Sequence, residues 1–436
     1  MTSRFKRAFL GLSALGMIAA SAAITSPVQA AKCTSTTKLS WAGQSFAVGA
    51  LPFNIAAEYD LDAKHCLDLS VVEVLSGSQT LANLVAGTAQ FTVGTVDNFM
   101  GWHATAPMTV FREVQTAPFF DIVVGKEYFE ANLKGKTFKQ MMSVLASGKL
   151  GITSAGGASE ATWKQLASGA GATLSGAFIA GLTSAANIAP ALSKKTIDAV
   201  VTWEPNTTLL TQGLTDSEAG VGVVAFSLKR PTKDMPAETN TPGLTLGATT
   251  AWFVEHKADA KNIDAMMDEA IAWARTPKNF AKVVAVIQKY SKVTNKVAIS
   301  LAKEYVNYFS ASGTINRTAW DITGPWYFNN LPAVVKNKSY TSNDFVYDLS
   351  VRDIKPLKLN KAYNAAYLAK TLGLATPKGS KISIVSNSTK VCTASSTGVT
   401  AKKAGTCDVI VTVTDKKAVG QKSKTRFART FITVKK

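Results

Sequence analysis

One short run of small residues could present backbone N–H groups to a polar ligand. Ser154, Gly156, Gly157 and Ser159 lie between a predicted strand and a predicted helix. A glycine-rich turn at the start of a helix exposes N–H donors at the positive end of the helix dipole, which favours an anionic or polar group. An ordinary turn with a serine cap is the alternative. The run lacks the lysine of a P-loop, so no nucleotide is predicted.

A second set of candidates follows strands that we predict in the first 100 residues. Small hydroxyls and free amides at strand ends could hold polar atoms of a ligand. Turn chemistry alone would explain about half of them. The candidates in this part of the chain are Gln44, Phe46, Ser76, Gly77, Ser78, Thr95, Val96 and Asp97.

Trp203 and Glu204 end the last strand predicted before residue 205. An indole offers a flat wall with one donor, and a carboxylate could hold an amine. Glu204 could equally well fix a hinge. If Asp97 and Glu204 share one cleft with no arginine nearby, a purely anionic ligand is disfavoured, and a zwitterion or a neutral ring is favoured.

The chain shows no pattern that indicates catalysis or metal binding. Its three histidines, His65, His103 and His256, are scattered, and neither a Gly-x-Ser-x-Gly elbow nor a His-Glu-x-x-His motif is present. An exported hydrolase would need an activated nucleophile, and none is visible. We therefore predict no enzyme, no cofactor and no metal.

Two series of alternating strands and helices must position these residues. In the first series we expect strands at 39–43, 69–75, 91–95 and 107–111, with helices at 50–59 and 79–86. In the second we expect strands at 150–153, 176–179 and 197–203, with helices at 160–168 and 186–193. This rhythm predicts an α/β protein with two parallel sheets and a ligand beyond the carboxyl ends of the strands.

Both ends of the chain differ from this body. A basic start, an apolar run at 8–24 and small residues at 28–30 predict a signal peptide cut after Ala30, and hence export. The apolar run is too short for a membrane anchor, and Lys32 disfavours lipid attachment at Cys33. Exported cysteines favour disulfides. Their clustering favours the pairs Cys33–Cys66 and Cys392–Cys407 over the two other pairings.

The C-terminal stretch 374–436 carries 13 Lys and Arg against 2 Asp and Glu, whereas 31–373 carries 32 against 27. Short β-branched runs after Pro377 predict a small all-β module there. Its cations could bind anionic cell-wall polymers, or they could only keep the module soluble and protect its edges. Two aromatic residues give no platform for nucleic acid. The basic residues that we expect on its surface are Lys402, Lys403, Lys416, Lys417, Lys422, Lys424, Arg426 and Arg429.

Several motifs resemble those of the nitrate/sulfonate/taurine-type solute-binding proteins. They are Leu133-Lys134-Gly135-Lys136, the glycine-rich segment at 151–159, Ala191-Leu192, and the Asp-Ala and Trp-Glu-Pro motifs within 197–205. The resemblance spans roughly 38–370. It implies a type II periplasmic-binding fold of two lobes with a hinge cleft. It also implies a small-molecule ligand and, as partners, an ABC permease and its ATPase. The run 391–407 resembles bacterial Ig-like modules.

Together these features predict an exported binding protein with a signal peptide at 1–30 and a basic Ig-like domain at 374–436. Lobe 1 is expected at 31–122 and 243–373, lobe 2 at 123–242, and the hinges near 120–124 and 245–253. The protein would be periplasmic, or extracellular and associated with the cell wall. The ligand would be a sulfonate, taurine, nitrate or an aromatic, pyrimidine-like compound. The alternative is a wall-associated adhesive or carbohydrate-interaction protein.

Overall fold

The computed structural model describes residues 33–235, 242–330, 340–416 and 424–436. Contacts separate residues 1–32 from residues 33–436, and only the second unit is considered below. The predicted signal peptide lies outside the described residues. Within them, every helix is too short or too polar to cross a bilayer.

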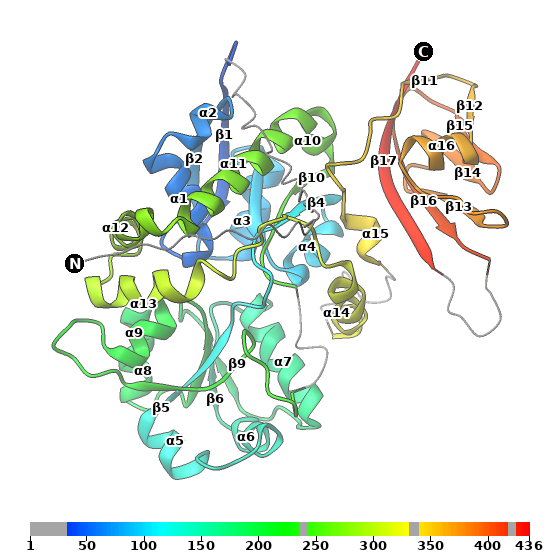
Figure 1. Cartoon of the computed structure of the whole chain (residues 1–436). Coiled ribbons are helices and arrows are strands. Elements are labelled where there is room, and N and C mark those ends of the chain that lie inside the picture. Colours follow the sequence, from blue (N-terminus) through cyan, green and yellow to red (C-terminus); the bar gives the residue numbers. More distant parts are fainter. Residues whose placement is uncertain (1–32, 236–241, 331–339, 417–423) are drawn as a thin grey trace, which may run out of the picture. The chain divides into compact units, whose positions relative to one another are not determined.

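The first sheet is mixed rather than parallel (Figure 1). Its strands, in order, are β2 (Leu67–Glu73), β1 (Thr37–Gly43), β3 (Phe91–Gly94), β10 (Thr245–Thr249) and β4 (Met108–Glu113). Strand β1 is parallel to β2 and β3, whereas β10 is antiparallel to β3 and β4. The prediction of a wholly parallel sheet is wrong because β10 enters this sheet from elsewhere in the chain, not through a local βαβ crossover.

Helices on both faces of the first sheet bury its core. The helix α11 illustrates why they form, since its apolar residues recur every three or four positions and face inward. Ile263, Met267 and Ala270 are fully buried there. The helices of this lobe are α1 (Leu51–Glu58), α2 (Leu61–Lys64), α3 (Gly77–Ala86), α4 (Val96–His103), α10 (Thr250–Glu255), α11 (Lys257–Arg275), α12 (Phe280–Ser291), α13 (Asn295–Tyr305), α14 (Arg317–Asn330) and α15 (Ser342–Phe345).

The second sheet is also mixed, and it has its own hydrophobic core. Its strands, in order, are β7 (Ala177–Ile179), β6 (Lys149–Gly151), β8 (Ala199–Thr202), β5 (Asp121–Gly125) and β9 (Gly222–Ser227). Strand β5 is antiparallel to both neighbours. The helices of this lobe are α5 (Lys126–Asn132), α6 (Phe138–Leu145), α7 (Ala158–Ala170), α8 (Ala185–Ser193) and α9 (Asn206–Gln212). A capping box formed by Thr137 and Gln140 starts α6.

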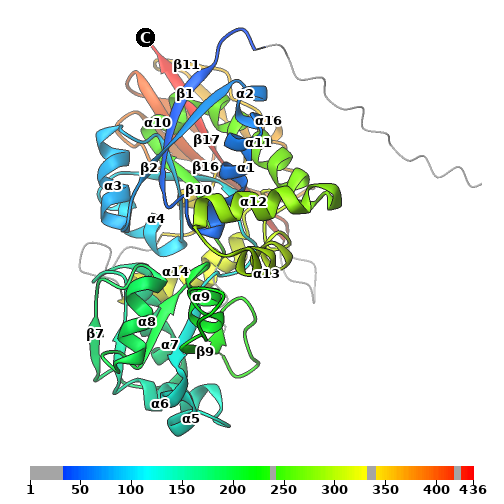
Figure 2. The same cartoon turned by 90° about the vertical axis from the view of Figure 1, so that its left-hand side faces the viewer.

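Two connections join the sheets, one between β4 and β5 at residues 114–120 and one between β9 and β10 at residues 228–244. Most residues of the predicted hinges at 120–124 and 245–253 lie in β5, β10 and the start of α10, directly after these connections. Hinges use loop or element-terminal residues, so the hinge positions stay a prediction. Figures 1 and 2 show α13 of the first lobe beside α9 of the second.

The C-terminal unit consists of two small sheets. One has the order β11 (Leu357–Lys358), β17 (Thr425–Lys435), β16 (Gly405–Thr414) and β13 (Lys381–Ser386). The other has the order β12 (Ala362–Asn364), β15 (Gly398–Ala401) and β14 (Cys392–Ser395). Helix α16 (Ala365–Thr371) packs into the same core. The unit thus begins before Leu357, earlier than the predicted boundary at residue 374.

This unit contacts the first lobe through β17. The Phe431 ring stacks on Tyr347 with 5.6 Å between ring centroids, and it lies 6.0 Å from Phe253. Arg429 is buried, pairs with Asp408 at 2.7 Å and donates to the Phe345 carbonyl at 3.1 Å. Aromatic packing and a paired, hydrogen-bonded guanidinium stabilise the contact.

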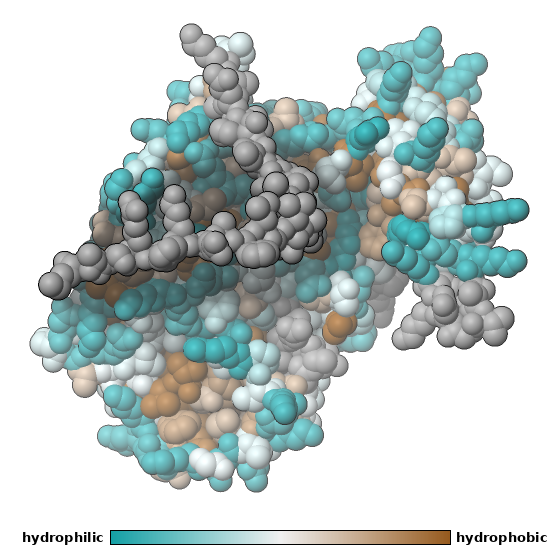
Figure 3. Space-filling model, viewed as in Figure 1, coloured by the Kyte–Doolittle hydropathy of each residue, from teal (hydrophilic) through white to brown (hydrophobic). Residues whose placement is uncertain are grey.

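The predicted cationic surface is therefore smaller than expected. Arg429 faces the first lobe, and Arg426 is held by both oxygens of Asp415 at 2.7 Å. Lys417 and Lys422 lie outside the described residues. Lys402, Lys403, Lys416 and Lys424 are exposed, and several hydrophilic side chains project from the visible side of this unit, between less polar residues (Figure 3).

Both predicted disulfides, Cys33–Cys66 and Cys392–Cys407, are present in the structure. The second joins the two small sheets, because Cys392 lies on β14 and Cys407 on β16. A thin core of this size depends on such a covalent link.

We predict that replacing both Cys392 and Cys407 by Ala destabilises the C-terminal unit by about 3 kcal/mol, the cost for a loop of about 15 residues. Urea denaturation would measure the change, with the Cys33→Ala/Cys66→Ala variant as a control that alters only the first lobe. Thiol titration of denatured, unreduced wild type should find no free thiol. A free thiol, or an unchanged transition, would contradict the assignment.

Candidate functional site

A cavity of about 160 Å³ lies between the two sheets and is lined by both lobes. The structure places nine of the fourteen candidate residues along it. These nine are Gln44, Ser76, Gly77, Thr95, Ser154, Gly157, Ser159, Trp203 and Glu204. They follow β1, β2, β3, β6 and β8, so strand ends of both sheets meet here, as the rule for open α/β sheets predicts.

The other five candidates are not on this cavity. Phe46 does not line the cavity, and its backbone carbonyl accepts a hydrogen bond from the Ser291 hydroxyl at 2.7 Å. The Ser78 hydroxyl bonds to that of Ser76 at 3.0 Å. Val96 and Asp97 line a second, much smaller cavity, and the Gly156 N–H is already bonded within the chain.

Most of the aromatic residues that line the cavity are not among the candidates predicted from the sequence. Trp102 lies on α4, and its ring packs against the end of β3, where a Cβ on Gly94 would lie 3.4 Å from it. Phe119 and Phe120 come from the first connection and contact Trp203, with ring centroids 6.2 and 5.9 Å away. Rings from both lobes therefore form walls of the cavity.

Other missed residues come from helix starts and from a distant helix. Thr80 and Asn98 lie one turn into α3 and α4, three positions after Gly77 and Thr95, so helical periodicity could have indicated them. Gln115, in the first connection, is buried, and its Oε1 atom has no hydrogen-bond partner among the described residues. Tyr305 comes from α13, and nothing in the sequence connects it to this cavity.

The turn before α7, predicted to hold an anionic group, already has a carboxylate of its own. The Gly156 N–H donates to Glu160 Oε2 at 2.8 Å, and Glu160 also pairs with Lys164 at 2.5 Å. The Thr153 N–H donates to the Ser159 hydroxyl at 3.0 Å. The positive end of this helix is therefore partly neutralised before any ligand arrives.

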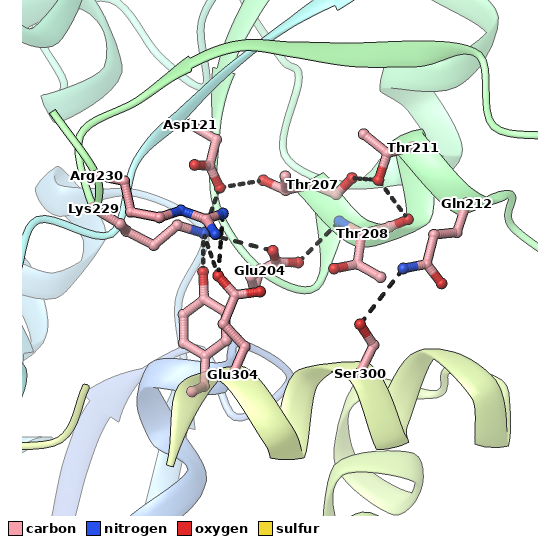
Figure 4. A network of polar contacts seen from close by, with 11 residues as sticks. Asp121, Glu204, Thr207, Thr208, Thr211, Gln212, Lys229, Arg230, Ser300 and Glu304 are labelled. Atoms are coloured by element: carbon pink, nitrogen blue, oxygen red, sulfur yellow. Dashed lines mark hydrogen bonds and ion pairs between the residues drawn. The ribbon is translucent and has the colours of Figure 1, made fainter. Parts of the chain in front are cut away.

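A buried ammonium group joins the lobes beside the cavity (Figure 4). Lys229, in the second connection, lies 2.7 Å from Asp121 Oδ2 and 3.7 Å from Glu204 Oε1. It also donates to the Tyr305 hydroxyl of α13 and lies 3.9 Å from Glu304. These contacts connect β5 and the end of β8 in the second lobe to α13 in the first.

Both the carboxyl group and the backbone carbonyl of Glu204 accept hydrogen bonds from other residues of the chain. Its Oε2 accepts from the Thr208 N–H at 2.9 Å, and its backbone carbonyl accepts from the Val48 N–H of the first lobe at 3.3 Å. Burial raises the pKa of the Glu204 carboxyl to about 7, against the opposing effect of Lys229, while Asp121 adds to the rise. These contacts give Glu204 a role in fixing the junction, although it also lines the cavity.

Asp97 lies in the first turn of α4 and is also buried. Burial raises its pKa to about 6, and hydrogen bonds from Thr95 and from backbone N–H groups oppose the rise. Asp97 lines the smaller cavity and Glu204 the larger one, so the two carboxyl groups do not line the same cavity. Within the described residues, no cluster of His, Cys, Asp and Glu could hold a metal.

We predict that wild type loses about 2–3 kcal/mol of stability relative to Glu204→Gln between pH 5 and pH 8. The folded-state pKa of about 7 exceeds the ordinary value of 4.5. The folded state therefore binds the proton more tightly, and stability falls as pH rises through this window. Urea denaturation across the range would measure it. The exposed Glu218→Gln variant should track wild type, and a constant difference for Glu204→Gln would refute the prediction.

No protein-family model matches the sequence, and no curated protein matches it. Solved structures do match. A protein from Bordetella bronchiseptica RB50 aligns with a TM-score of 0.60 and 20% identity, covering 71% of this chain and 94% of that one. The alkanesulfonate-binding protein SsuA from Xanthomonas axonopodis pv. citri, bound to MOPS, aligns at 0.55 and 14%, covering 72% and 99%.

The periplasmic aliphatic sulphonate binding protein SsuA from Escherichia coli aligns with a TM-score of 0.51 and 19% identity, covering 69% of this chain and 91% of that one. These proteins span the two lobes, and their coverage leaves more than a quarter of the present chain unmatched. Identities this low establish the fold alone. The chain has the two-lobed fold of periplasmic substrate-binding proteins, to which a small C-terminal β unit is added.

Proposed function

We propose that this protein is the exported solute-binding component of an ABC importer, which captures a small molecule between its lobes and delivers it to a permease. The observation that carries the proposal is the cavity, which is lined by strand ends of both sheets and by both connections between them. In such a geometry a ligand contacts two lobes at once, so binding can favour a closed arrangement. The protein would catalyse no reaction and need no cofactor.

The lining suits a small organic molecule better than a polymer. It combines the rings of Trp102, Phe119 and Trp203 with hydroxyls and amides such as those of Ser76 and Asn98. Apolar walls with a few polar groups are typical of small-molecule sites. Sulfonates, taurine, nitrate and aromatic or pyrimidine-like compounds are the candidates. No feature of the described residues specifically favours the alternative, an adhesive or carbohydrate-interaction protein.

We predict that a cognate ligand at 100 times its dissociation constant stabilises the protein by about 2.7 kcal/mol. Thermal unfolding against a solute panel, with native mass spectrometry of the purified protein, would identify the ligand. Trp203→Ala should lose most of the ligand-induced shift. Trp273→Ala is a matched control, because Trp273 packs on Tyr59 in the first lobe and does not line the cavity.

If no solute shifts the unfolding temperature of wild type, the transport proposal fails. An equal loss of the ligand-induced shift in Trp203→Ala and in Trp273→Ala would place the binding site elsewhere.

We further propose that the C-terminal unit attaches the exported protein to anionic cell-wall polymers. The support is the cluster of exposed lysines at Lys402, Lys403, Lys416 and Lys424 within a unit of strong positive charge. Because β17 packs on the first lobe, removing the unit would expose Phe253 and Tyr347. A charge variant of the whole chain therefore tests the proposal better than a truncation.

We predict that changing these four lysines to Gln reduces co-sedimentation with purified cell walls at low salt. Wild-type retention should also fall at high salt, since exposed charges are screened within about 8 Å at physiological ionic strength. Equal retention of wild type and variant would contradict the attachment and leave the importer proposal untouched.

A further inference from the structure

Acidic side chains of the chain itself lie at the starts of α7, α9 and α4, whereas α3, which also begins at the cavity, has none in its first turn. Glu160 accepts from the Gly156 N–H before α7, and Glu204 accepts from the Thr208 N–H in the first turn of α9. Asp97, which is buried, lies in the first turn of α4. Helix starts attract anions because of their free N–H groups and their dipole. At α7, α9 and α4 that attraction is already used by the chain.

No lysine or arginine lies among the described residues of the cavity wall. Glu204 is the one ionisable carboxyl group among these described residues. The nearby Lys229 has a nearly buried side chain, at 3% exposure, and its ammonium is engaged by Asp121, Tyr305 and Glu204. An anionic ligand would therefore lose its hydration without gaining a countercharge, which is costly.

One uncharged residue of the lining offers a buried hydrogen-bond acceptor without a partner. Gln115 is 2% exposed, lines the cavity, and its Oε1 acceptor has no partner among the described residues. A buried acceptor left unpaired is unfavourable, and a ligand N–H would satisfy it. Trp102, Phe120 and Trp203 supply flat apolar surfaces nearby, which match the faces of a ring.

We propose that the ligand is a small flat ring compound that has at least one N–H donor and no net negative charge. The proposal rests on the proposed function, because it specifies what the same cleft captures. It separates this protein from the sulfonate-binding proteins whose fold it shares. Gln115 acts as the acceptor that recognises the ligand N–H, and the aromatic walls hold the ring.

The test uses matched pairs of ring compounds that differ in one substituent, which is either a neutral group with N–H donors or an anion without them. Nicotinamide is paired with nicotinate, benzamide with benzoate, and benzenesulfonamide with benzenesulfonate. Ligand-observed NMR with the full mature chain would measure each affinity, and Trp203→Ala would identify binding in the cleft by its loss. We expect the amide of each pair to bind at least about tenfold more tightly than the acid, since each acid adds a buried, unpaired charge.

A second variant tests the role of Gln115. Gln115→Met keeps the length of the side chain but removes the acceptor, so amide affinity should fall by about tenfold while acid affinity stays nearly constant. Thermal unfolding of the variant checks that it folds. Acids that bind as tightly as their amides would overturn the proposal while leaving solute binding intact. If neither class binds in the cleft, the ring proposal fails, whereas the proposed function fails only if the wider solute panel also gives no shift.

Discussion

The buried ammonium of Lys229 is the interaction on which the junction of the lobes depends. Removing a lysine and its acidic partners from water costs several kcal/mol per ion, and the cost is recovered only where geometry and hydrogen bonds are good. Here Asp121 at 2.7 Å, the Tyr305 hydroxyl and Glu204 surround the ammonium. Because Tyr305 belongs to α13 of the first lobe and Asp121 to β5 of the second, the charge can be satisfied fully only when the lobes meet.

This constraint also shapes the cleft. Glu204 lines the cavity and belongs to the same network, so its carboxylate is balanced by Lys229 rather than left free for a ligand. Burial raises its pKa to about 7, so its ionisation is sensitive to small changes near neutral pH. Any lobe movement that separates Lys229 from Tyr305 would change the surroundings of Glu204 as well. Ligand capture and the electrostatics of the junction are thus physically connected.

The C-terminal unit packs against the first lobe and is not a loosely attached tail. Its β17 strand places Phe431 in the core of the first lobe and Arg429 against the Phe345 carbonyl. Two of the cations that give this stretch its charge therefore have structural partners, Asp408 for Arg429 and Asp415 for Arg426. The exposed lysines remain available to other molecules. Because β17 packs on the first lobe, other molecules can reach these lysines only from the sides of the unit that this contact leaves open.

Most of the two α/β series, both disulfide pairs and the strand ends that meet at the cleft can be predicted from the amino-acid sequence, whereas strands β5, β9 and β10 are not among the expected elements. The predicted features follow from local periodicity, turn residues and the compactness of the units that contain each cysteine pair. Ser76, Ser154 and Trp203 could be placed this way because the carboxyl end of a parallel strand has a predictable position. The direction of β10 could not, since it depends on how the chain returns from the second sheet.

The charges that are available to a ligand could not be predicted from the sequence, because they depend on contacts formed only in the folded protein. The sequence does not single out Glu160, and it leaves Glu204 between a ligand contact and a hinge role. The bonds of these carboxylates to Gly156, Thr208 and Lys229 depend on side-chain directions and, for Lys229 and Glu204, on a contact across 25 residues. Tyr305 reaches the cavity from a helix about 100 residues beyond Trp203. Pairing and burial arise from long-range packing, which leaves no periodic pattern along the chain, and therefore the chemistry of the cleft became visible only in the folded protein.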